Sequence, residues 1–132
     1  MNAAELVTYH FAVLRVVPHV HLGACVNVGV LLHVRTAEFL GMRAISDAAA
    51  LRALVPDVDH ELLARYLRCY QGICDGDAAV GPIALIPPSE RFHWLTAPRS
   101  DVLQASPVHE GLSAHPAQEL EDLYAKFVTR RS

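Results

Sequence analysis

Apolar residues dominate two segments in the first third of the chain, and their β-branched and aromatic character is typical of β-strands. Residues 8–17 are dominated by β-branched and aromatic side chains and end at Pro18. Both alternating sets of this segment are mostly apolar. A strand with two apolar faces is typical of the middle of a sheet. We therefore predict a central strand here.

Two further strands are expected at 25–34 and, more weakly, at 38–45. In the first of these every even position is apolar, so the two-residue period directs that row toward the core. Asn27, Gly29 and His33 fall on the opposite face. Because the connection between the first two strands is a short turn at 18–23, they are expected to form an antiparallel hairpin.

Helices are predicted where apolar residues recur at three- and four-residue spacing. Asp47 is expected to cap a short helix, and Asp57 or Asp59 to cap a longer helix over 61–74. Pro116 suits the first position of a last helix, which continues with an apolar stripe. The first two of these helices follow the three predicted strands of the first third of the chain.

The segment 91–112 differs from the rest because it is polar and yet rich in bulky side chains. It holds the only Trp of the chain together with two Arg, two His and a Gln. We expect a strand at 91–96 that ends at Pro98, a short strand at 102–105, and irregular structure at 107–114. This polar stretch is the candidate functional segment.

The pattern as a whole predicts an α+β fold. We expect a single globular domain over 1–132, with an antiparallel sheet of about four to five strands and helices packed on one face. The length of 132 residues and the hydrophobic content of 52% suit one folded domain with a core of its own.

Composition narrows the partners and the location. The formal net charge of -3 provides no global field that would gather nucleic acid or anionic lipid, so neither partner is expected. No apolar run approaches the roughly 20 residues that span a bilayer, and the first residues do not resemble a signal peptide. Three cysteines without regular spacing indicate reduced thiols, so we expect a cytoplasmic protein.

Metal and cofactor motifs are weak. His19 and His21 could share one side of an extended segment, and Cys69 and Cys74 could meet at a helix end. Neither pair has the spacing that makes zinc binding convincing. The glycines form no phosphate-binding or dinucleotide-binding motif. We therefore predict no metal and no cofactor.

Catalytic motifs are also weak. Ser100, Asp101 and His109 are close in sequence, but a nucleophile elbow is absent and neighbours in sequence rarely converge as a triad. Cys25 begins the predicted valine-rich strand, and a cysteine in such a strand is usually a small core residue. The residues alone therefore assign no reaction.

A binding site built from side chains is the stronger prediction. Arginine presents a fork that suits phosphate or carboxylate groups, and histidine, hydroxyl and amide groups can add to it. In the alternative interpretation the arginines pair with nearby carboxylates or cap strand ends. Asn27 needs hydrogen-bond partners on its strand and is expected to brace the polar stretch. The predicted binding residues are Asn27, Arg91, Arg99, Ser100, Gln104 and His109.

Four segments of the chain resemble the bacterial domain-of-unknown-function family 3037, DUF3037. They are YHFAVLRVVP at 9–18, VNVGVLL at 26–32, RFHWLTAPRS at 91–100 and QASPVHEGL at 104–112. The resemblance extends from Tyr9 to Val128. The family usually carries an acidic residue at the position occupied here by Ala24, so any role of that carboxylate is absent or moved.

The resemblance implies no established activity and assigns no catalytic residue. It marks the motif positions Arg15, Asn27, Gly29, Arg91, Arg99, Ser100, Gln104 and His109. Members are often encoded beside a kinase-like protein similar to the HipA toxins, which implies a partner or accessory role.

Two functions follow as predictions. The first is a non-catalytic binding or regulatory module for a protein partner. A HipA-like kinase is one candidate for that partner. The alternative is a small enzyme or ligand-binding domain for an anionic, phosphate-bearing small molecule. In that alternative Arg91 and Arg99 would clamp the anion, and His109 would act as general acid or base.

Overall fold

The computed structural model describes residues 5–17, 25–99 and 101–130. The predicted turn at 18–23 therefore lies outside the described residues. The strands are β1 (Val7–Val16), β2 (Val26–Val34), β3 (Phe39–Ala44), β4 (Leu103–Ala105) and β5 (His109–Ser113). The α-helices are α1 (Ala48–Leu54), α2 (His60–Asp75), α3 (Pro88–Thr96) and α4 (Pro116–Tyr124), and a π-helical turn (Ala125–Thr129) continues α4.

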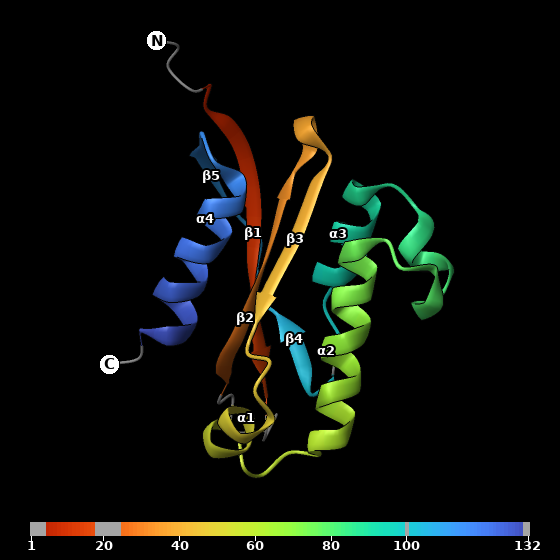
Figure 1. Cartoon of the computed structure of the whole chain (residues 1–132), viewed down its shortest axis with the longest axis vertical. Helices are drawn as coiled ribbons and strands as arrows, with labels where there is room; N and C mark the ends of the chain where they lie inside the picture. Colours follow the sequence, from red (N-terminus) through yellow and green to blue (C-terminus); the bar gives the residue numbers. More distant parts are fainter. Residues whose placement is uncertain (1–4, 18–24, 100, 131–132) are drawn as a thin grey trace.

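The strands form one antiparallel sheet with β1 at its centre. On one side β1 pairs with β2, which in turn pairs with β3. On its other side β1 pairs with β4 and, further along, with β5. The predicted α+β class, the central first strand and the antiparallel hairpin are confirmed (Figure 1).

Helices cover both faces of the sheet, which corrects the expectation that they pack on one face. α1, α2 and α3 share a core with Leu14 and Leu31. α4 lies across the sheet on a second core that includes Phe11 and Val30 (Figure 1). The physical reason is the one that makes β1 central: both of its alternating sets are apolar, so each face needs a cover.

A β-bulge in β2 divides the row of even-numbered apolar residues between these two cores. The register shifts after Leu14, so Arg15 lies opposite Asn27 and Val28 is the extra residue. Val28 therefore packs in the core under α2, whereas Val30 packs under α4. The prediction that the whole row faces one core is wrong, because an inserted residue interrupts strict alternation.

The predicted helix starts at the aspartates are confirmed. The side chain of Asp47 accepts a hydrogen bond from the backbone N–H of Ala49 at 3.1 Å, and Asp59 accepts one from Leu62 at 3.0 Å. Each satisfies an N–H group that has no partner within its helix. α2 ends at Gly76, whose φ of 71° is the left-handed conformation that glycine adopts without strain.

Residues 91–96 belong to helix α3, where a strand was predicted. Pro88 takes the first helical position, where its missing N–H costs nothing, and Glu90 follows in the first turn. Phe92 and Leu95 are three residues apart and both are buried, which is helical spacing. The β-propensity of the aromatic residues was outweighed by this helix start.

Residues 109–113 form strand β5, where irregular structure was predicted. They lie opposite Val7 to Phe11 of β1 and extend the sheet beyond β4. The pairing satisfies backbone groups of β1 that β4 does not reach. The predicted short strand at 102–105 is confirmed by β4.

α4 begins at Pro116 as predicted and packs closely on β3. A Cβ atom built on Gly41 of β3 would lie 2.9 Å from Leu120 of α4, so a larger residue here would have to displace that side chain. β3 is an edge strand, in agreement with its weak sequence pattern. Among the described residues no helix is long and apolar enough to cross a membrane.

Candidate binding surfaces

Arg91 closes the end of α2. Its Nη1 donates to the carbonyl oxygens of Ile73 at 2.6 Å and Cys74 at 3.1 Å, and its Nε donates to that of Ile86 at 2.8 Å. Carbonyl groups in the last turn of a helix have no partner within the helix, and a cation there also suits the helix dipole. Arg91 therefore joins α3 to α2 as a cap.

Arg99 lies in an aromatic cluster between α2 and α3. Its guanidinium carbon is 4.3 Å from the centre of the Trp94 ring, and its Nη2 donates to the Trp94 carbonyl at 2.5 Å. Its Nη1 donates to the Tyr70 hydroxyl at 2.6 Å. Burial raises the pKa of Tyr70, so this hydroxyl stays protonated at neutral pH. Arg99 thus fixes its own segment to both helices.

A polar row crosses three strands on the α4 side of the sheet. Arg15 lies opposite Asn27 in β2 and opposite Gln104 in β4, so the three side chains leave the same face. The Nδ2 of Asn27 donates to the Phe127 carbonyl at 3.0 Å, and the Nε2 of Gln104 donates to that of Asp101 at 3.0 Å. This bond of Asn27 braces the C-terminal helix, whereas the sequence predicted a brace to the polar stretch.

The predicted anion site is not assembled by the described residues. His109 is exposed, and the centre of its ring lies 5.3 Å from that of Phe11, on the sheet face that α4 covers. Arg91 and Arg99 both contact α2, which covers the other face. Ser100 lies outside the described residues, as does Ala24. Three of the six predicted residues share the α4 face: Asn27, Gln104 and His109.

The described residues also bring no predicted nucleophile and base together. Oδ1 of Asp101 accepts a hydrogen bond from the Tyr66 hydroxyl of α2 at 3.3 Å. This carboxylate and the ring of His109 therefore lie on opposite faces of the sheet. Burial raises the thiol pKa of Cys74 to about 12, which makes it unreactive at neutral pH. Within the described ranges no group of three or more His, Cys, Asp or Glu could hold a metal ion. His19 and His21 lie outside those ranges.

Three exposed apolar residues lie along β5 and at the start of β1, and we name this part of the sheet the β5 corner. Leu6, Val108 and Leu112 are 64%, 44% and 62% exposed. Leu112 lies opposite Thr8 of β1, on the face where α2 and α3 pack. α2 packs on β3, and α3 on β2, β3 and β4, so the main contacts of both helices lie away from β5.

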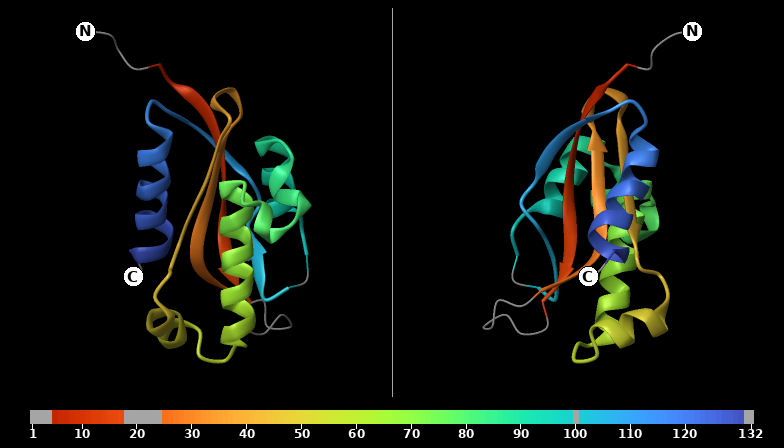
Figure 2. Two further views of the ribbon diagram at one scale, coloured as in Figure 1. Left: turned by 45° about the vertical axis from the view of Figure 1, so that its right-hand side comes forward. Right: turned by 90° about the vertical axis from the view of Figure 1, so that its left-hand side faces the viewer.

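The outer edge of β5 is free within the described part of the chain. The backbone N–H and C=O groups of odd-numbered residues in β1 point toward β4 and β5. For example, the Val13 carbonyl accepts a hydrogen bond from the Ser106 N–H at 2.8 Å. Their partners in β5 are residues 109, 111 and 113. Because backbone direction alternates along a strand, Glu110 and Leu112 point their N–H and C=O groups outward. Figure 2 (right) shows β5 beyond β1, at the margin of the sheet opposite β3.

Sequence reasoning placed Val108 and Leu112 within the candidate segment 91–112, but it singled out the polar residues of that segment and not these apolar ones. β5 reads His-Glu-Gly-Leu-Ser, which has no apolar alternation. The available signal was a single apolar residue among polar ones, and such residues are ordinary on protein surfaces. Only the pairing of β5 with β1 brings Leu112 near the start of β1.

The architecture and these surfaces define a small α+β domain with a helix-covered antiparallel sheet, whose described part is edged by β3 on one side and by β4 and β5 on the other. The chain belongs to the family described as "Protein of unknown function (DUF3037)", whose model matches residues 11–128. This match confirms the resemblance carried by the four sequence segments. No curated protein and no solved structure matches the chain.

Proposed function

We propose that this protein is a non-catalytic module that binds a protein partner through the β5 corner. The observation that carries the proposal is the coincidence of exposed Leu6, Val108 and Leu112 with the free edge of β5. A free edge is a template for another strand, and clustered apolar side chains at the surface mark interaction sites.

The partner's chemistry follows from this surface. An extended segment of the partner would pair with the outward backbone groups of Glu110 and Leu112, which is strand addition. Its apolar side chains would cover Leu112 and Val108. The contact between His10 Nε2 and Glu110 Oε1, at 3.1 Å, lies next to Leu112 on the same face, so the partner would also meet this polar pair. The kinase-like protein implied by the family resemblance is the first candidate to test.

The alternative, a phosphate-bearing small molecule, has less support. Its two clamps, Arg91 and Arg99, already donate hydrogen bonds to α2, and its general acid or base, His109, packs on the opposite face. Binding an anion with both arginines would break the cap of α2 and the aromatic cluster. A protein partner at the β5 corner requires neither change.

The test is affinity capture from the native host with a tagged protein, compared with two leucine variants. Leu112→Lys places a charge in the β5 corner and should lose the partner. Leu85→Lys is the matched control, because Leu85 is 67% exposed but lies in the turn that precedes α3. Equal capture by both variants and the wild type would contradict the proposal.

Two further measurements separate the other outcomes. If a panel of nucleotides and phosphates raises the melting temperature by the amount that ligand linkage requires, and capture yields no partner, the ligand-binding alternative replaces ours. If sedimentation shows a dimer that Leu112→Lys dissociates, the β5 corner binds a second copy of this chain instead.

A further inference from the structure

A groove lies at the other edge of the sheet, between β3, α1 and α2. Its volume is about 370 Å³, and it is open to solvent. Met42 and Ala44 of β3 form one wall, and Ala64 and Leu67 of α2 form the facing wall. Small side chains on both walls create the space. The groove runs along a strand edge that Figure 1 shows facing the viewer, between α4 and α2.

The edge of β3 offers backbone groups beside this groove. The N–H of Ile45 donates to the Val28 carbonyl at 2.9 Å, so odd-numbered positions here bond toward β2. Because the direction alternates, the even positions of β3 point their N–H and C=O away from β2. These positions are Leu40, Met42 and Ala44.

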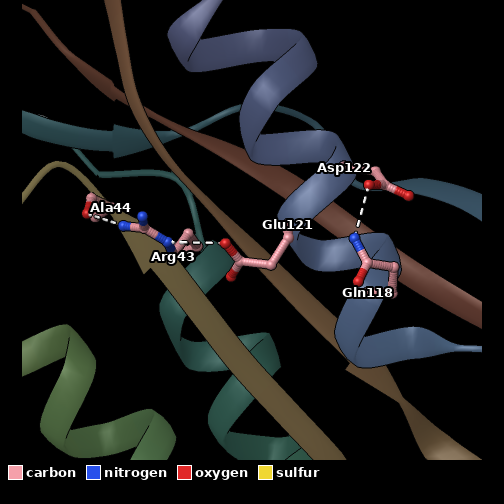
Figure 3. A network of polar contacts seen from close by, with 5 residues as sticks. All are labelled: Arg43, Ala44, Gln118, Glu121 and Asp122. Carbon is pink, nitrogen blue, oxygen red and sulfur yellow. Dashed lines mark hydrogen bonds and ion pairs between the residues drawn. The ribbon is translucent and has the colours of Figure 1, made fainter.

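Arg43 ends this free edge at its C-terminal side. Its Nη1 donates to the Ala44 carbonyl at 3.1 Å, and its Nε donates to Oε1 of Glu121 at 3.0 Å (Figure 3). Its guanidinium carbon also lies 4.3 Å from the centre of the Tyr124 ring of α4. The carbonyl of Ala44 is therefore occupied, and the groups of Leu40 and Met42 are those left for a new strand.

The geometry of strand pairing determines which side chain of an added peptide would enter the groove. Side chains of neighbouring strands at paired positions lie on the same face. Met42 faces α2, since it belongs to the core that α2 shares. A peptide residue paired beside Met42 would therefore direct its side chain into the groove, and the residues before and after it would point toward α4.

A positive charge in the lining of the groove indicates which second group of the peptide would bind there. Arg68 is the one charged residue that lines the groove, and it is exposed on α2. Among the described residues it makes no ion pair or hydrogen bond. The neighbouring Gln71 already donates to Oδ1 of Asp75 at 3.0 Å. The guanidinium fork of Arg68 is suited to a carboxylate.

We propose that this groove binds an extended peptide that adds to β3 as a further strand. The peptide places an apolar side chain between Met42 and Leu67 and a carboxylate on Arg68. The carboxylate comes from an acidic side chain or from the C-terminus of the peptide. This site goes beyond the proposed function, because it uses the opposite edge of the sheet and needs no residue of the β5 corner.

The experiment is selection of random heptapeptides displayed on phage against the immobilised full chain. One library ends in a free C-terminus, and a second carries a fixed Gly-Ser tail, so the two sources of carboxylate are distinguished. Peptides enriched from either library should pair an apolar residue with the carboxylate. No enrichment, or enrichment of basic peptides, would overturn the proposal.

Variants then locate the site with a synthetic copy of the best peptide. Arg68→Glu should weaken binding at least about tenfold, whereas Arg65→Glu, also exposed on α2 but outside the groove, should leave it unchanged. Ala64→Trp should fill the groove and abolish binding, with the fold checked by circular dichroism. Equal losses with the two glutamate variants would reject Arg68 as the carboxylate partner.

Two controls complete the design. Methylation of alternate backbone nitrogens of the peptide should abolish binding, because strand addition needs those N–H groups. Leu112→Lys should not change peptide affinity, so failure of the β5 corner and failure of the groove remain distinguishable. Self-association that Ala64→Trp removes, without peptide binding, would assign the groove to a second copy and overturn our proposal.

Discussion

The α2–α3 side of the sheet and the β5 corner use opposite kinds of residue. On the first, Arg91 and Arg99 are partly buried and donate to carbonyl and hydroxyl groups. At the second, Leu6 and Leu112 are largely exposed. The residues that looked functional in the sequence therefore stabilise the fold, and residues that looked ordinary form the surface without a cover.

The difference follows from the energetics of burial. A polar group removed from water must find hydrogen-bond partners, so the arginines near α2 are held by the structure itself. An exposed apolar group costs little by itself but is released from water when a partner covers it. Partly buried polar residues thus support the architecture here, and the exposed apolar residues are those through which we propose association.

The largest effect on stability is expected from Arg91→Ala. It removes the cap of α2 and leaves the carbonyls of Ile73, Cys74 and Ile86 without this donor, which should lower the free energy of unfolding by about 2–3 kcal/mol. Urea denaturation measures this. Arg91→Lys keeps the charge but not the fork and should lose less. A change within about 0.5 kcal/mol, as for an ordinary surface residue, would show that the cap is unimportant.

Arg99→Ala should have the next largest effect. Removing its stacking on Trp94 and its bond to Tyr70 should cost about 1 kcal/mol. A double-mutant cycle with Trp94→Ala should give a coupling energy, since the two side chains are in contact. Strict additivity of the two single changes would contradict the cluster.

The pH dependence of stability should report on His33, at the boundary between the two regions. His33 is buried against Phe92, and burial, followed by the nearby His10 and Arg35, lowers its pKa from 6.5. Between the two pKa values, His33 is protonated in the unfolded chain and neutral in the folded chain. Stability from this group is therefore full above about pH 6.5 and is lost as the pH falls toward the lower folded pKa.

The slope from this single proton cannot exceed about 1.4 kcal/mol per pH unit. His33→Gln should flatten the curve below pH 6.5 when the free energy of unfolding is measured by urea at several pH values. His10→Gln, at the position paired with His33, should retain most of the slope, because burial is the main cause. An unchanged slope in His33→Gln would assign the effect to another group.

The smallest effect on stability is expected from Leu112→Lys. This side chain is 62% exposed, so the free energy of unfolding should change by no more than about 0.5 kcal/mol. Thermal unfolding of the purified variant measures this. A larger loss would mean that Leu112 supports the fold, and the contrast between the β5 corner and the α2–α3 side would then fail.

Much of the fold was accessible from the sequence because its signals are local. β-Branched and aromatic composition located β1, two-residue alternation oriented β2, and a weaker strand pattern located β3. The side chains of Asp47 and Asp59 marked helix starts. α3 was missed because aromatic residues in 91–96 suggested a strand, although Pro88 already offered a helix start. β5 was missed because its strand character comes from its pairing with β1.

The candidate site was less accessible. The sequence singled out Arg91 and Arg99 as binding residues, whereas in the structure they donate to carbonyl and hydroxyl groups of the protein itself, among them groups of α2 from a different part of the chain. It also singled out Asn27 and Gln104, which the register aligns on either side of Arg15. Which polar residues come into contact depends on the register of the strands and on the sheet face to which each side chain points.

The sequence alone determined the α+β class, the central position of β1 and the family, because periodicity, capping residues and motifs are properties of neighbouring residues. Tertiary structure decided that α4 covers a second face, that the bulge at Val28 divides the apolar row, and that β3 and β5 are edges of the described sheet. These features arise from contacts between distant segments. Exposure is likewise a property of the folded chain, so only the structure distinguishes Leu112 at the surface from Leu31 in the core.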